Sequence, residues 1–593
     1  MESSKGEQPV DPFERAVAGL ALGAERDVAK IRAMLRREEA TADRPSLRKL
    51  EKVQEMRSAA EVEEALADIV RNELPPTPRN KSAAVVVEGG MSLLTCARLP
   101  LFSFLWLLPC VPCSSLAESG DREVRPCESP VSGLQALCKS IPVPENWSSP
   151  DGRTISLNVM ILRGKRELRQ PDPFFVLVGG PGQAASEGAG WIAAAFATIL
   201  DRRDIVLIDV RGTGKSQPIQ CAAYAGSGLQ RFLGPAYTKE SAEECSRRLM
   251  ETADLKHYNS LAAVRDMEHV RLTLGYPAIN LYGTSYGTRL AMAYMKEYPQ
   301  HVRTAALESV FPTPVSPLVN APLDAERTLR ILIQDCERDP RCAAAFKNLR
   351  VTFQNVLNNL RIKQATVHLT LRDGKSAAIN ISADAFATGV RNLLYTAGTA
   401  RYIPLIIERA AHGDFDAFAR FTIRRGQGYE QGLSHAVFLC TACSELYGRV
   451  QEKSVLTDAR SSFLGDSSTR MLLDVCRVWP HAELPASFFE PLRCDVPVLL
   501  LSGWLDPAAP PRWAEEASLH MRNSLHLVIR DGHHNFSDLS PRGCTDSIIA
   551  ALVEKGRLDG LDTTCVTEMH RPEFAITPQE FPEIPIEDPG GGK

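Results

Sequence analysis

The sequence predicts an α/β fold, in which a mostly parallel sheet has helices on both faces and carries an inserted, mainly helical cap. From about residue 140, near-continuous apolar segments alternate with helical segments, which is typical of parallel strands buried on both faces. Residues 315–480 instead indicate a succession of helices, because their apolar residues recur at helical spacing. Strand-like segments return after residue 481, so the helical insertion interrupts one sheet.

The predicted strands of the sheet share short, near-continuous apolar runs that end in turns. In chain order they lie within residues 153–164, 173–182, 203–216, 278–287, 301–313, 495–507 and 524–536. One hairpin is expected within the cap, at residues 365–382. The predicted core therefore has two parts, residues 118–314 and 481–570, and a Pro- and Gly-rich flexible tail is expected at 571–593.

Length and composition limit the class of protein. The 593 residues are too many for one ordinary core, so about two to four structural units are expected. Apolar residues make up 44% and charged residues 24%, the balance of a globular protein and not of a disordered chain. The formal net charge of −4 gives no broad basic field for a nucleic acid, and the mean hydropathy of −0.15 excludes a polytopic membrane protein.

Residues 1–90 differ from the rest of the chain. They are rich in Glu, Arg and Lys, carry apolar residues at roughly helical spacing, and contain no Cys or Trp. Residues 91–117 then follow the order of a secretory signal peptide: one positive charge at Arg98, an apolar run, and a small-residue site that ends at Ala117. The run is short for a membrane span and is interrupted by prolines.

Three interpretations of this region stay open. The simplest is that translation starts at Met91 and that the preceding residues are a mis-assigned upstream extension. The others are a genuine helical domain followed by an internal anchor, and a buried hydrophobic helix, which the prolines disfavour. A lipoprotein site at Cys110 or Cys113 is discounted, because Pro109 and Pro112 stand where a small residue is expected.

The strongest indication of chemistry is the segment GTSYG, residues 283–287, between a predicted strand and a predicted helix. It matches the G-x-S-x-G nucleophile elbow in the required context, with Ser285 on a tight strand-to-helix turn. The two glycines leave room for the turn, and the helix N-terminus favours negative charge that develops near the hydroxyl. Ser285 is therefore predicted to be a nucleophile rather than part of a chance pentapeptide in a loop.

Two glycine-containing loops precede this serine. The first, VGGPG at residues 178–182, follows a predicted buried strand, and its backbone can approach a substrate oxygen. We expect the N–H groups of Gly180 and Tyr286 to form an oxyanion hole. The second, DVRGTGKS at residues 209–216, resembles a phosphate-binding P-loop, but Asp209 stands where the first glycine is required. We interpret it as a structural loop that supports the first one.

The acid and the base of such a site should follow the serine in the order Asp, His. Asp506 comes directly after a predicted strand in the segment LLLSGWLDPAAPP, where a triad acid is expected. His533 and His534 follow on the loop after the last predicted strand, and both are candidates for the base. The histidine would take the serine proton, and Asp506 would hold its tautomer and stabilise the imidazolium.

The segments GGPG, DVRGTGKS, GTSYG and GWLDPAAPP, in this order, resemble the tripeptidyl aminopeptidase and proline iminopeptidase family of α/β-hydrolase serine exopeptidases, and most of all its secreted branch. The resemblance covers roughly residues 127–565 and implies the α/β-hydrolase fold. One departure is Val178, where the proline iminopeptidases have a histidine. Another is the Gly-His-His segment: an ungapped match to the family loop favours His534 as the base, whereas the family's Gly-His dipeptide favours His533.

The resemblance implies a secreted serine exopeptidase that releases short peptides or single residues from peptide N-termini. Ser285 would form an acyl-enzyme, Gly180 and Tyr286 would hold the oxyanion, and His534 would return the proton to the leaving amine. Peptides are the expected partners; no cofactor, metal, nucleic acid or stable membrane insertion after signal cleavage is expected. The alternatives are a carboxylesterase or lipase-like hydrolase with the same triad, and a non-catalytic binding protein on this fold.

An exopeptidase of this kind needs a carboxylate that pairs with the α-ammonium group of its substrate. The segment CSE, residues 443–445, resembles the family segment that carries such an acid, which makes Glu445 the candidate. A solvated helix glutamate is the structural alternative for Glu445. Glu187, just beyond the oxyanion loop, is a second candidate for the ammonium partner.

Cysteine usage favours an oxidising compartment, so the expected location is secreted or periplasmic. Twelve of the fifteen cysteines follow Ala117. Local disulfides are expected for Cys127–Cys138, Cys221–Cys245, Cys336–Cys342 and Cys544–Cys565, and the family resemblance suggests Cys443–Cys476. Cys440 and Cys494 are left over, and zinc would need tighter clusters of Cys and His than these.

Overall fold

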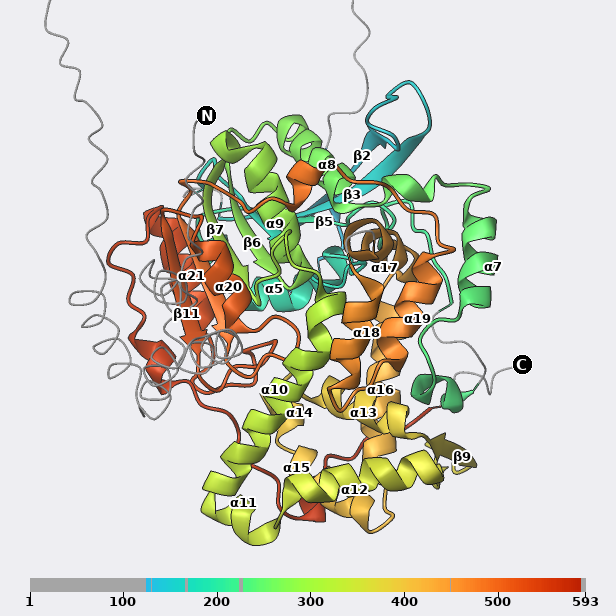
Figure 1. Cartoon of the computed structure of the whole chain (residues 1–593). Coiled ribbons are helices and arrows are strands. Elements are labelled where there is room, and N and C mark those ends of the chain that lie inside the picture. Colours follow the sequence, from blue (N-terminus) through green and yellow to red (C-terminus); the bar gives the residue numbers. More distant parts are fainter. Residues whose placement is uncertain (1–123, 130, 166–168, 223–227, 448–449, 588–593) are drawn as a thin grey trace, which may run out of the picture. The chain divides into compact units, whose positions relative to one another are not determined.

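The computed structural model describes residues 124–129, 131–165, 169–222, 228–447 and 450–587 (Figure 1). The predicted helical extension and signal peptide lie outside the described residues. Within these ranges the main sheet has nine strands in the order β1-β2-β3-β5-β4-β6-β7-β10-β11. The predicted α/β class with a mostly parallel sheet is therefore confirmed.

Parallel strands form the larger part of the sheet, and one edge is antiparallel. The parallel strands are β5 (Ile205–Ile208), β4 (Phe174–Leu177), β6 (Ile279–Thr284), β7 (Val302–Glu308), β10 (Val498–Gly503) and β11 (Ser524–Ile529). The antiparallel edge consists of β1 (Arg125–Cys127), β2 (Ala136–Pro144) and β3 (Thr154–Leu162). Because parallel strands end at the same edge of a sheet, the loops that follow β4, β6, β10 and β11 meet there.

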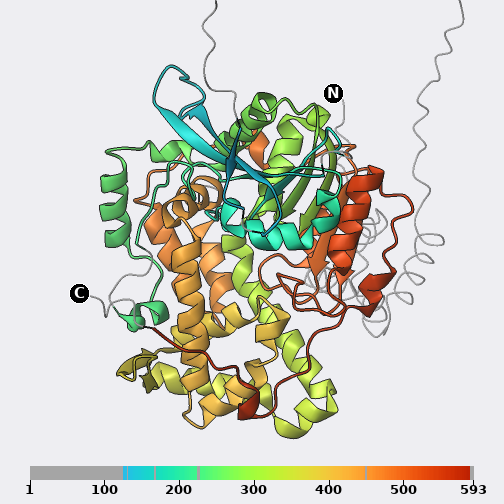
Figure 2. The same cartoon turned by 180° about the vertical axis from the view of Figure 1, so that it is seen from behind.

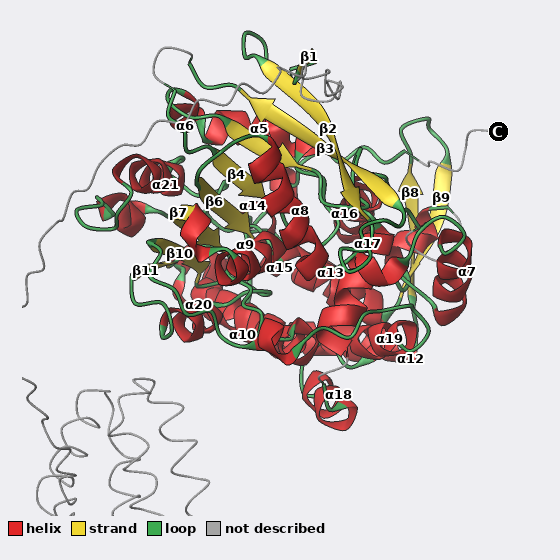
Figure 3. Ribbon diagram, turned by 90° about the horizontal axis from the view of Figure 1, so that it is seen from above, coloured by secondary structure: helices red, strands yellow, loops and turns green. Residues whose placement is uncertain are grey.

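Helices cover both faces of the sheet (Figure 3). One face carries α8 (Ser260–Thr273), α9 (Tyr286–Glu297) and α20 (Pro511–Ser518). The other face carries α5 (Ala189–Ala195), α6 (Ala197–Leu200) and α21 (Cys544–Lys555). Side chains of a strand alternate between the two faces, so Phe175 and Leu177 pack in the first layer and Phe174 and Val176 in the second. This alternation explains why the strand sequences are apolar throughout.

The chain between β7 and β10 forms the cap, which Figures 1 and 2 show below the sheet. Its helices are α10 (Pro317–Arg338), α11 (Pro340–Ala345), α12 (Leu349–Ile362), α13 (Ala383–Leu393), α14 (Ala397–Ala400), α15 (Ile403–Ala411), α16 (Asp416–Gly432), α17 (His435–Ala442), the π-helical turn η5 (Cys443–Tyr447), α18 (Glu452–Arg460) and α19 (Ser467–Cys476). The predicted hairpin is β8 (Ala365–Thr370) with β9 (Ser376–Ile381). Phe353, Phe386 and Phe418 lie at the centre of the cap's own apolar core.

The C-terminal segment differs from the predicted flexible tail. Phe574 and Ile586 are buried in the apolar core of the cap. The Ala575 N–H donates to the Arg401 carbonyl at 3.1 Å, and the Arg372 N–H donates to the Ile586 carbonyl at 3.0 Å. The prediction followed the Pro- and Gly-rich composition, whereas burial of a large apolar side chain stabilises by about 1.5–3 kcal/mol and fixes the segment on the cap.

Disulfides join neighbouring parts of the described chain. They are Cys127–Cys138, Cys221–Cys245, Cys336–Cys342, Cys443–Cys476 and Cys544–Cys565, the pairs expected from the sequence. Cys440 and Cys494 form no disulfide within the described ranges. The Cys443–Cys476 bond ties η5 to α19 and thereby holds the turn that carries Glu445.

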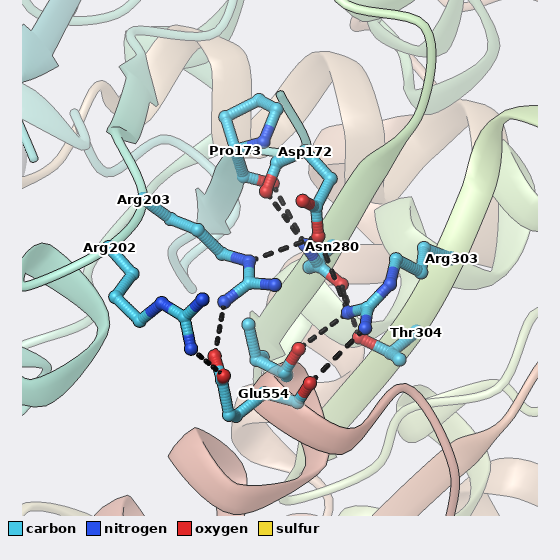
Figure 4. A network of polar contacts seen from close by, with 9 residues as sticks. Asp172, Pro173, Arg202, Arg203, Asn280, Arg303, Thr304 and Glu554 are labelled. Atoms are coloured by element: carbon cyan, nitrogen blue, oxygen red, sulfur yellow. Dashed lines mark hydrogen bonds and ion pairs between the residues drawn. The ribbon is translucent and has the colours of Figure 1, made fainter. Parts of the chain in front are cut away.

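A polar network fixes the amino ends of the central strands (Figure 4). The fully buried Asn280, in β6, donates from its amide to the carbonyl and to the carboxylate of Asp172, both at 2.9 Å. Its amide oxygen accepts from the hydroxyl of Thr304 in β7 at 2.7 Å. Arg203 donates to the Asp172 carboxylate at 3.0 Å and to Glu554 of α21 at 2.8 Å. The network therefore joins β6 and β7, the residues that precede β4 and β5, and α21 at the edge opposite to the strands' carboxyl ends.

Replacing Asn280 with leucine tests this network. We expect the free energy of unfolding to fall by about 2–3 kcal/mol, because buried polar partners that lose a hydrogen bond carry their desolvation cost. Denaturant titration measures the loss, and the exposed Asn359 of α12, changed to leucine in the same way, should shift it by less than about 0.5 kcal/mol. Similar losses in the two variants would contradict the role of Asn280.

Candidate active site

Ser285 lies between β6 and α9 in a turn that excludes side chains at its neighbours. Its φ of 55° and ψ of −124° fall in a region that residues other than glycine rarely adopt. A Cβ atom at Gly287 would lie 2.0 Å from the Leu177 carbonyl oxygen, and one at Gly283 would lie 2.5 Å from the Gly287 carbonyl oxygen. Both glycines of the elbow are thus required by packing, and the turn presents the hydroxyl at the N-terminus of α9.

A chain of hydrogen bonds joins Ser285, His534 and Asp506. The Ser285 Oγ lies 2.9 Å from His534 Nε2, and Nδ1 of the same ring lies 2.8 and 3.0 Å from the two carboxylate oxygens of Asp506. A carboxylate only accepts, so Nδ1–H donates to Asp506 and Nε2 accepts from the serine hydroxyl. This is the arrangement of protons that a general base next to a serine requires.

Asp506 is ionised although it is completely buried. Burial by itself raises the pKa of this carboxyl, but His534 and the N–H groups of Ala508 and Ala509 outweigh burial and hold the pKa below its usual value. The loop is also held from the cap, because the Thr328 hydroxyl of α10 donates to the Asp506 carbonyl at 3.2 Å. A fixed negative charge therefore faces the imidazole.

The structure brings His534, and not His533, to the serine. His533 is fully buried, and its Nδ1 lies 2.6 Å from the Leu394 carbonyl of the cap. Burial lowers the pKa of His533 to about 4, so this ring is neutral and anchors the loop. The His534 N–H donates to the Tyr395 carbonyl at 3.0 Å, and the Tyr395 ring contacts the imidazole edge to face, with 5.0 Å between centroids.

The glycine loop after β4 lies directly beside the serine. A Cβ atom at Gly179 would be 3.2 Å from the Ser285 Cβ, so a side chain there would force the serine to shift by a few tenths of an ångström. Within the described residues, neither the Gly180 N–H nor the Tyr286 N–H has an acceptor. Unpaired N–H groups next to the attacking oxygen are what an oxyanion hole requires.

Asp209 holds this glycine loop from behind. Its fully buried carboxylate accepts from the N–H and the hydroxyl of Ser186, both at 2.9 Å, just beyond the glycines. It also accepts from the Asn158 amide of β3 at 2.9 Å and from the Lys215 N–H at 3.1 Å. The residue that departs from a P-loop thus orients the glycine loop after β4, and it does so without a cationic partner among these donors.

Glu445 lies in a buried ion pair between the cap and the core. Its Oε2 accepts from Arg289 Nε of α9 at 2.7 Å, and its Oε1 accepts from the Ser260 N–H at the start of α8 at 2.9 Å. The Ser260 hydroxyl in turn lies 2.8 Å from the Tyr286 hydroxyl. The alternative of a solvated glutamate therefore does not hold for Glu445, whereas Glu187 is exposed in the short helix η1 (Ser186–Gly188).

A cavity of about 280 Å³ opens beside Glu445. It is lined by residues 313–316, which follow β7, by Asn320 of α10 and by Val450. The Ser316 hydroxyl is buried and has no hydrogen-bond partner within the described residues. The cavity thus combines a carboxylate with an unused hydroxyl, and its volume is close to the lower limit of about 300 Å³ for small-ligand pockets.

Glu308 is a site residue that the sequence analysis did not single out. It ends β7, its carbonyl accepts from the Ser285 N–H at 2.9 Å, and its buried carboxylate accepts from the Tyr282 hydroxyl at 3.0 Å. Burial above all, with the negative charges of Asp546 and Asp506, raises the pKa of Glu308 to about 7. The signal in the sequence that could have indicated Glu308 was a single acidic residue at the end of a largely apolar, strand-like segment.

Within the ranges that the structure describes, no three or more His, Cys, Asp or Glu side chains are grouped so that they could hold a metal ion. None of the helices in those ranges combines the length and the apolar character needed to cross a membrane.

The family described as alpha/beta hydrolase fold matches residues 172–541, more than half of the chain, and the chain belongs to this family. With its serine at the elbow, the fold defines an enzyme of the serine hydrolase class. Relatives named tripeptidyl aminopeptidase and serine protease confirm the resemblance that the motifs indicated.

The chain is similar to the tripeptidyl aminopeptidase of Streptomyces lividans, with 24% identity over 462 residues that cover 72% of this chain and 83% of the relative. It is 27% identical to the serine protease Hip1 of Mycobacterium tuberculosis over 196 residues, 31% of this chain. That match spans only 37% of the length of the first curated relatives. A solved proline iminopeptidase of Mycobacterium smegmatis aligns with 13% identity and a TM-score of 0.34, covering 70% of this chain and 98% of that one.

Glu308→Gln is expected to change how stability depends on pH. Between the ordinary pKa of 4.5 and the folded value of about 7, the unfolded chain releases a proton that the folded chain keeps. The free energy of unfolding of the wild type therefore falls as pH rises through this window, by up to about 3 kcal/mol. Glutamine keeps an acceptor for Tyr282 and does not ionise, so the variant should gain stability over the wild type at pH 8 and little at pH 5.

Denaturant titrations of both proteins at pH 5 and pH 8 measure this difference. The same stability difference at the two pH values would show that Glu308 does not titrate in this window.

Proposed function

We propose that the protein is a serine exopeptidase, an aminopeptidase that hydrolyses peptide bonds near peptide N-termini through an acyl-enzyme. The observation that carries the proposal is the hydrogen-bonded chain from Ser285 through His534 to Asp506 beneath a helical cap. The relative named tripeptidyl aminopeptidase, which aligns with most of this chain, supports the choice of peptide substrates.

In this proposal Ser285 Oγ attacks the scissile carbonyl while His534 Nε2 takes the hydroxyl proton. The N–H groups of Gly180 and Tyr286 stabilise the oxyanion of the tetrahedral intermediate. His534 then gives the proton to the leaving nitrogen as the C–N bond breaks, and the peptide amine departs. Water, activated by the same imidazole, hydrolyses the acyl-enzyme.

The cavity beside Glu445 supports the exopeptidase character. Each oxygen of this carboxylate accepts one hydrogen bond from the protein, and each has a further lone pair that an α-ammonium group of a substrate can use. The unpaired Ser316 hydroxyl offers an additional acceptor in the same cavity. The cap limits access to this region, which favours short or unfolded substrates.

We propose further that the enzyme works outside the cytoplasm, secreted or periplasmic, because its disulfides form and persist in oxidising compartments. N-terminal sequencing of the exported protein is expected to begin near Glu118, after the signal-like segment. A mature species that still carries residues 1–90 would contradict this proposal.

Ser285→Ala is expected to abolish turnover and to leave the fold intact. Members of a triad act as a unit, so kcat should fall roughly 10⁴-fold or more. Hydrolysis of a peptidyl reporter measures the loss, and thermal unfolding checks the fold. Retention of more than about a tenth of the wild-type activity would exclude Ser285 as the nucleophile.

Glu445→Gln tests the ammonium partner. With free-amine peptides we expect a loss of roughly 1.5–3 kcal/mol of transition-state binding, the range for a hydrogen bond to a charged group. N-acetylated peptides lack the charge, so the wild type should cleave them slowly and the variant should cleave them at a similar rate. Product analysis by mass spectrometry, on both peptide series, gives the rates and the length of the released fragment.

The matched control is Glu326→Gln in α10, since Glu326 also accepts from a backbone N–H, that of Phe463 at 3.0 Å, and faces an arginine. It should leave both peptide series unchanged. Equal losses on both series in the Glu445 variant would mean that Glu445 only supports the structure. Efficient wild-type cleavage of acetylated peptides would exclude the aminopeptidase, and turnover of acyl esters alone would indicate an esterase.

A further inference from the structure

Two residues of the cap lie beside the site: the aromatic Tyr395 lies against His534, and the apolar Leu433 lies beside the glycine loop that adjoins the serine. Tyr395, between α13 and α14, contacts the His534 ring. Leu433, which follows α16, has its Cδ1 3.0 Å from where a Cβ atom of Gly180 would lie, and the Ser434 N–H donates to the Gly182 carbonyl at 2.8 Å. Side chains of α13 and α16 that adjoin Tyr395 therefore face the region where a substrate leaves the histidine.

Two arginines of the cap lie against this tyrosine. The guanidinium carbon of Arg425, in α16, is 4.8 Å from the centre of the Tyr395 ring, and that of Arg391, in α13, is 5.2 Å from it. Arg391 donates to the Tyr395 hydroxyl at 2.9 Å, and Arg425 donates to the Tyr429 hydroxyl at 3.0 Å. The four side chains are half-buried, so they combine partial shielding from water with access from the site.

Neither arginine has a carboxylate partner in the part of the chain that the structure describes, and the Nε of Arg425 is buried there without any hydrogen bond. By contrast, the fully buried arginines Arg211 and Arg289 are paired: Arg211 lies 2.6 Å from Asp266, and Arg289 lies 2.7 Å from Glu445. Buried charges are normally paired, because an unpaired charge loses hydration without compensation. The two guanidinium groups thus offer unused donors and positive charge.

The Asp506 carboxylate does not supply the missing partner. Its oxygens are engaged by His534 and by the N–H groups of Ala508 and Ala509. The positive charge above the histidine is therefore available to a ligand.

We propose that Arg391 and Arg425 form a subsite for a carboxylate on the leaving fragment of the substrate, namely the C-terminal carboxylate of a short peptide. The proposal rests on the exopeptidase function, in which His534 protonates the leaving nitrogen, so the leaving fragment lies beside His534 and Tyr395. Guanidinium groups bind carboxylates in a planar, two-point geometry, which suits this ligand.

The reach of a short fragment agrees with these positions. The N–Cα and Cα–C bonds, each about 1.5 Å long, put the carboxylate carbon of a single leaving residue about 2.5 Å from the leaving nitrogen, and one more residue adds about 3.8 Å. Tyr395 lies between the imidazole and the arginines. The centre of its ring is 5.0 Å from the centre of the imidazole and about as far from each guanidinium carbon. By these distances each guanidinium carbon lies at most about 10 Å from the centre of the imidazole, so the carboxylate of a leaving fragment of one or two residues is within reach of the arginines.

The test compares peptides that differ only in the C-terminal group of a one-residue leaving fragment, free acid against carboxamide. For the wild type we expect kcat/KM for the acid to exceed that for the amide about tenfold to a hundredfold. Arg425→Met should lower the ratio at least several-fold, mainly by slowing cleavage of the acid, because the neutral amide lacks the charge that pairs with the guanidinium. Arg391→Met should act in the same direction.

Controls separate charge, shape and folding. Arg424→Met, at an exposed arginine of the same helix, should keep the wild-type ratio. Arg425→Lys keeps the charge without the planar fork and should retain only part of the preference. Unchanged rates with the amide peptide show that each variant is folded and that His534 is still oriented.

Further peptides distinguish the source of the carboxylate. Carboxamide peptides with Glu or Gln as the leaving residue should be cleaved at similar rates. A preference for Glu in this series, without a preference for the free C-terminal acid, would place the carboxylate on a side chain and overturn the proposal. A wild-type ratio of one between acid and amide, or a ratio that Arg425→Met leaves intact, would overturn it as well, even if cleavage still required a free N-terminus.

A binding measurement remains informative if no peptide is cleaved and the exopeptidase function itself fails. With an acyl ester as reporter, free dipeptides should then inhibit turnover through the arginines, and dipeptide amides should not. Loss of this inhibition in Arg425→Met supports the subsite independently of peptidase activity, and equal inhibition by acids and amides contradicts it.

Discussion

The site depends on how closely β4 and β6 approach each other at their carboxyl ends. The start of α9 lies so near to Leu177 that Gly287 has no room for a methyl group. Ser285 must therefore take a positive φ, which turns its hydroxyl out of the sheet and leaves the Tyr286 N–H beside it. The same strands are held in register at their amino ends by the network around Asn280. The geometry around the serine is thus a consequence of strand pairing, fixed from the far edge of the sheet.

Residues of the cap contact each part of the site that the core carries. Leu394 and Tyr395 hold the two histidines of the loop after β11, and Ser434 holds the glycine loop at Gly182. Glu445 joins the N-terminus of α8 to α9, one turn beyond the serine. A displacement of the cap would therefore change the His534 loop, the glycine loop after β4 and the cavity together.

Local sequence predicted those features that depend on where a strand ends. Ser285, Asp506 and the histidine pair each follow a strand-like run, and parallel strands bring such positions to one edge. The choice between His533 and His534 is different, because it depends on which ring the Leu394 carbonyl takes. Likewise, the sequence left open whether Glu445 is an ammonium partner or a solvated helix glutamate. Its partner Arg289 lies far away in the sequence, so neither the ion pair nor the burial was visible before the fold was known.

On our two proposals, the charged groups around the site would favour peptides of a particular length. The negative charge of Glu445 is neutralised by Arg289, and an ammonium group beside Glu445 would share this carboxylate with Arg289. No carboxylate among the described residues pairs with the arginines at Tyr395. A short peptide has a positive N-terminus and a negative C-terminus, and in a capped site of low dielectric both ends interact strongly with groups of opposite sign. Both groups belong to the cap, which has its own apolar core. On our two proposals, a peptide that satisfies both ends at once has a defined length, and one that is longer satisfies only the ammonium end. Selection for short peptides would then follow from charge spacing, in addition to the steric limit that the cap imposes.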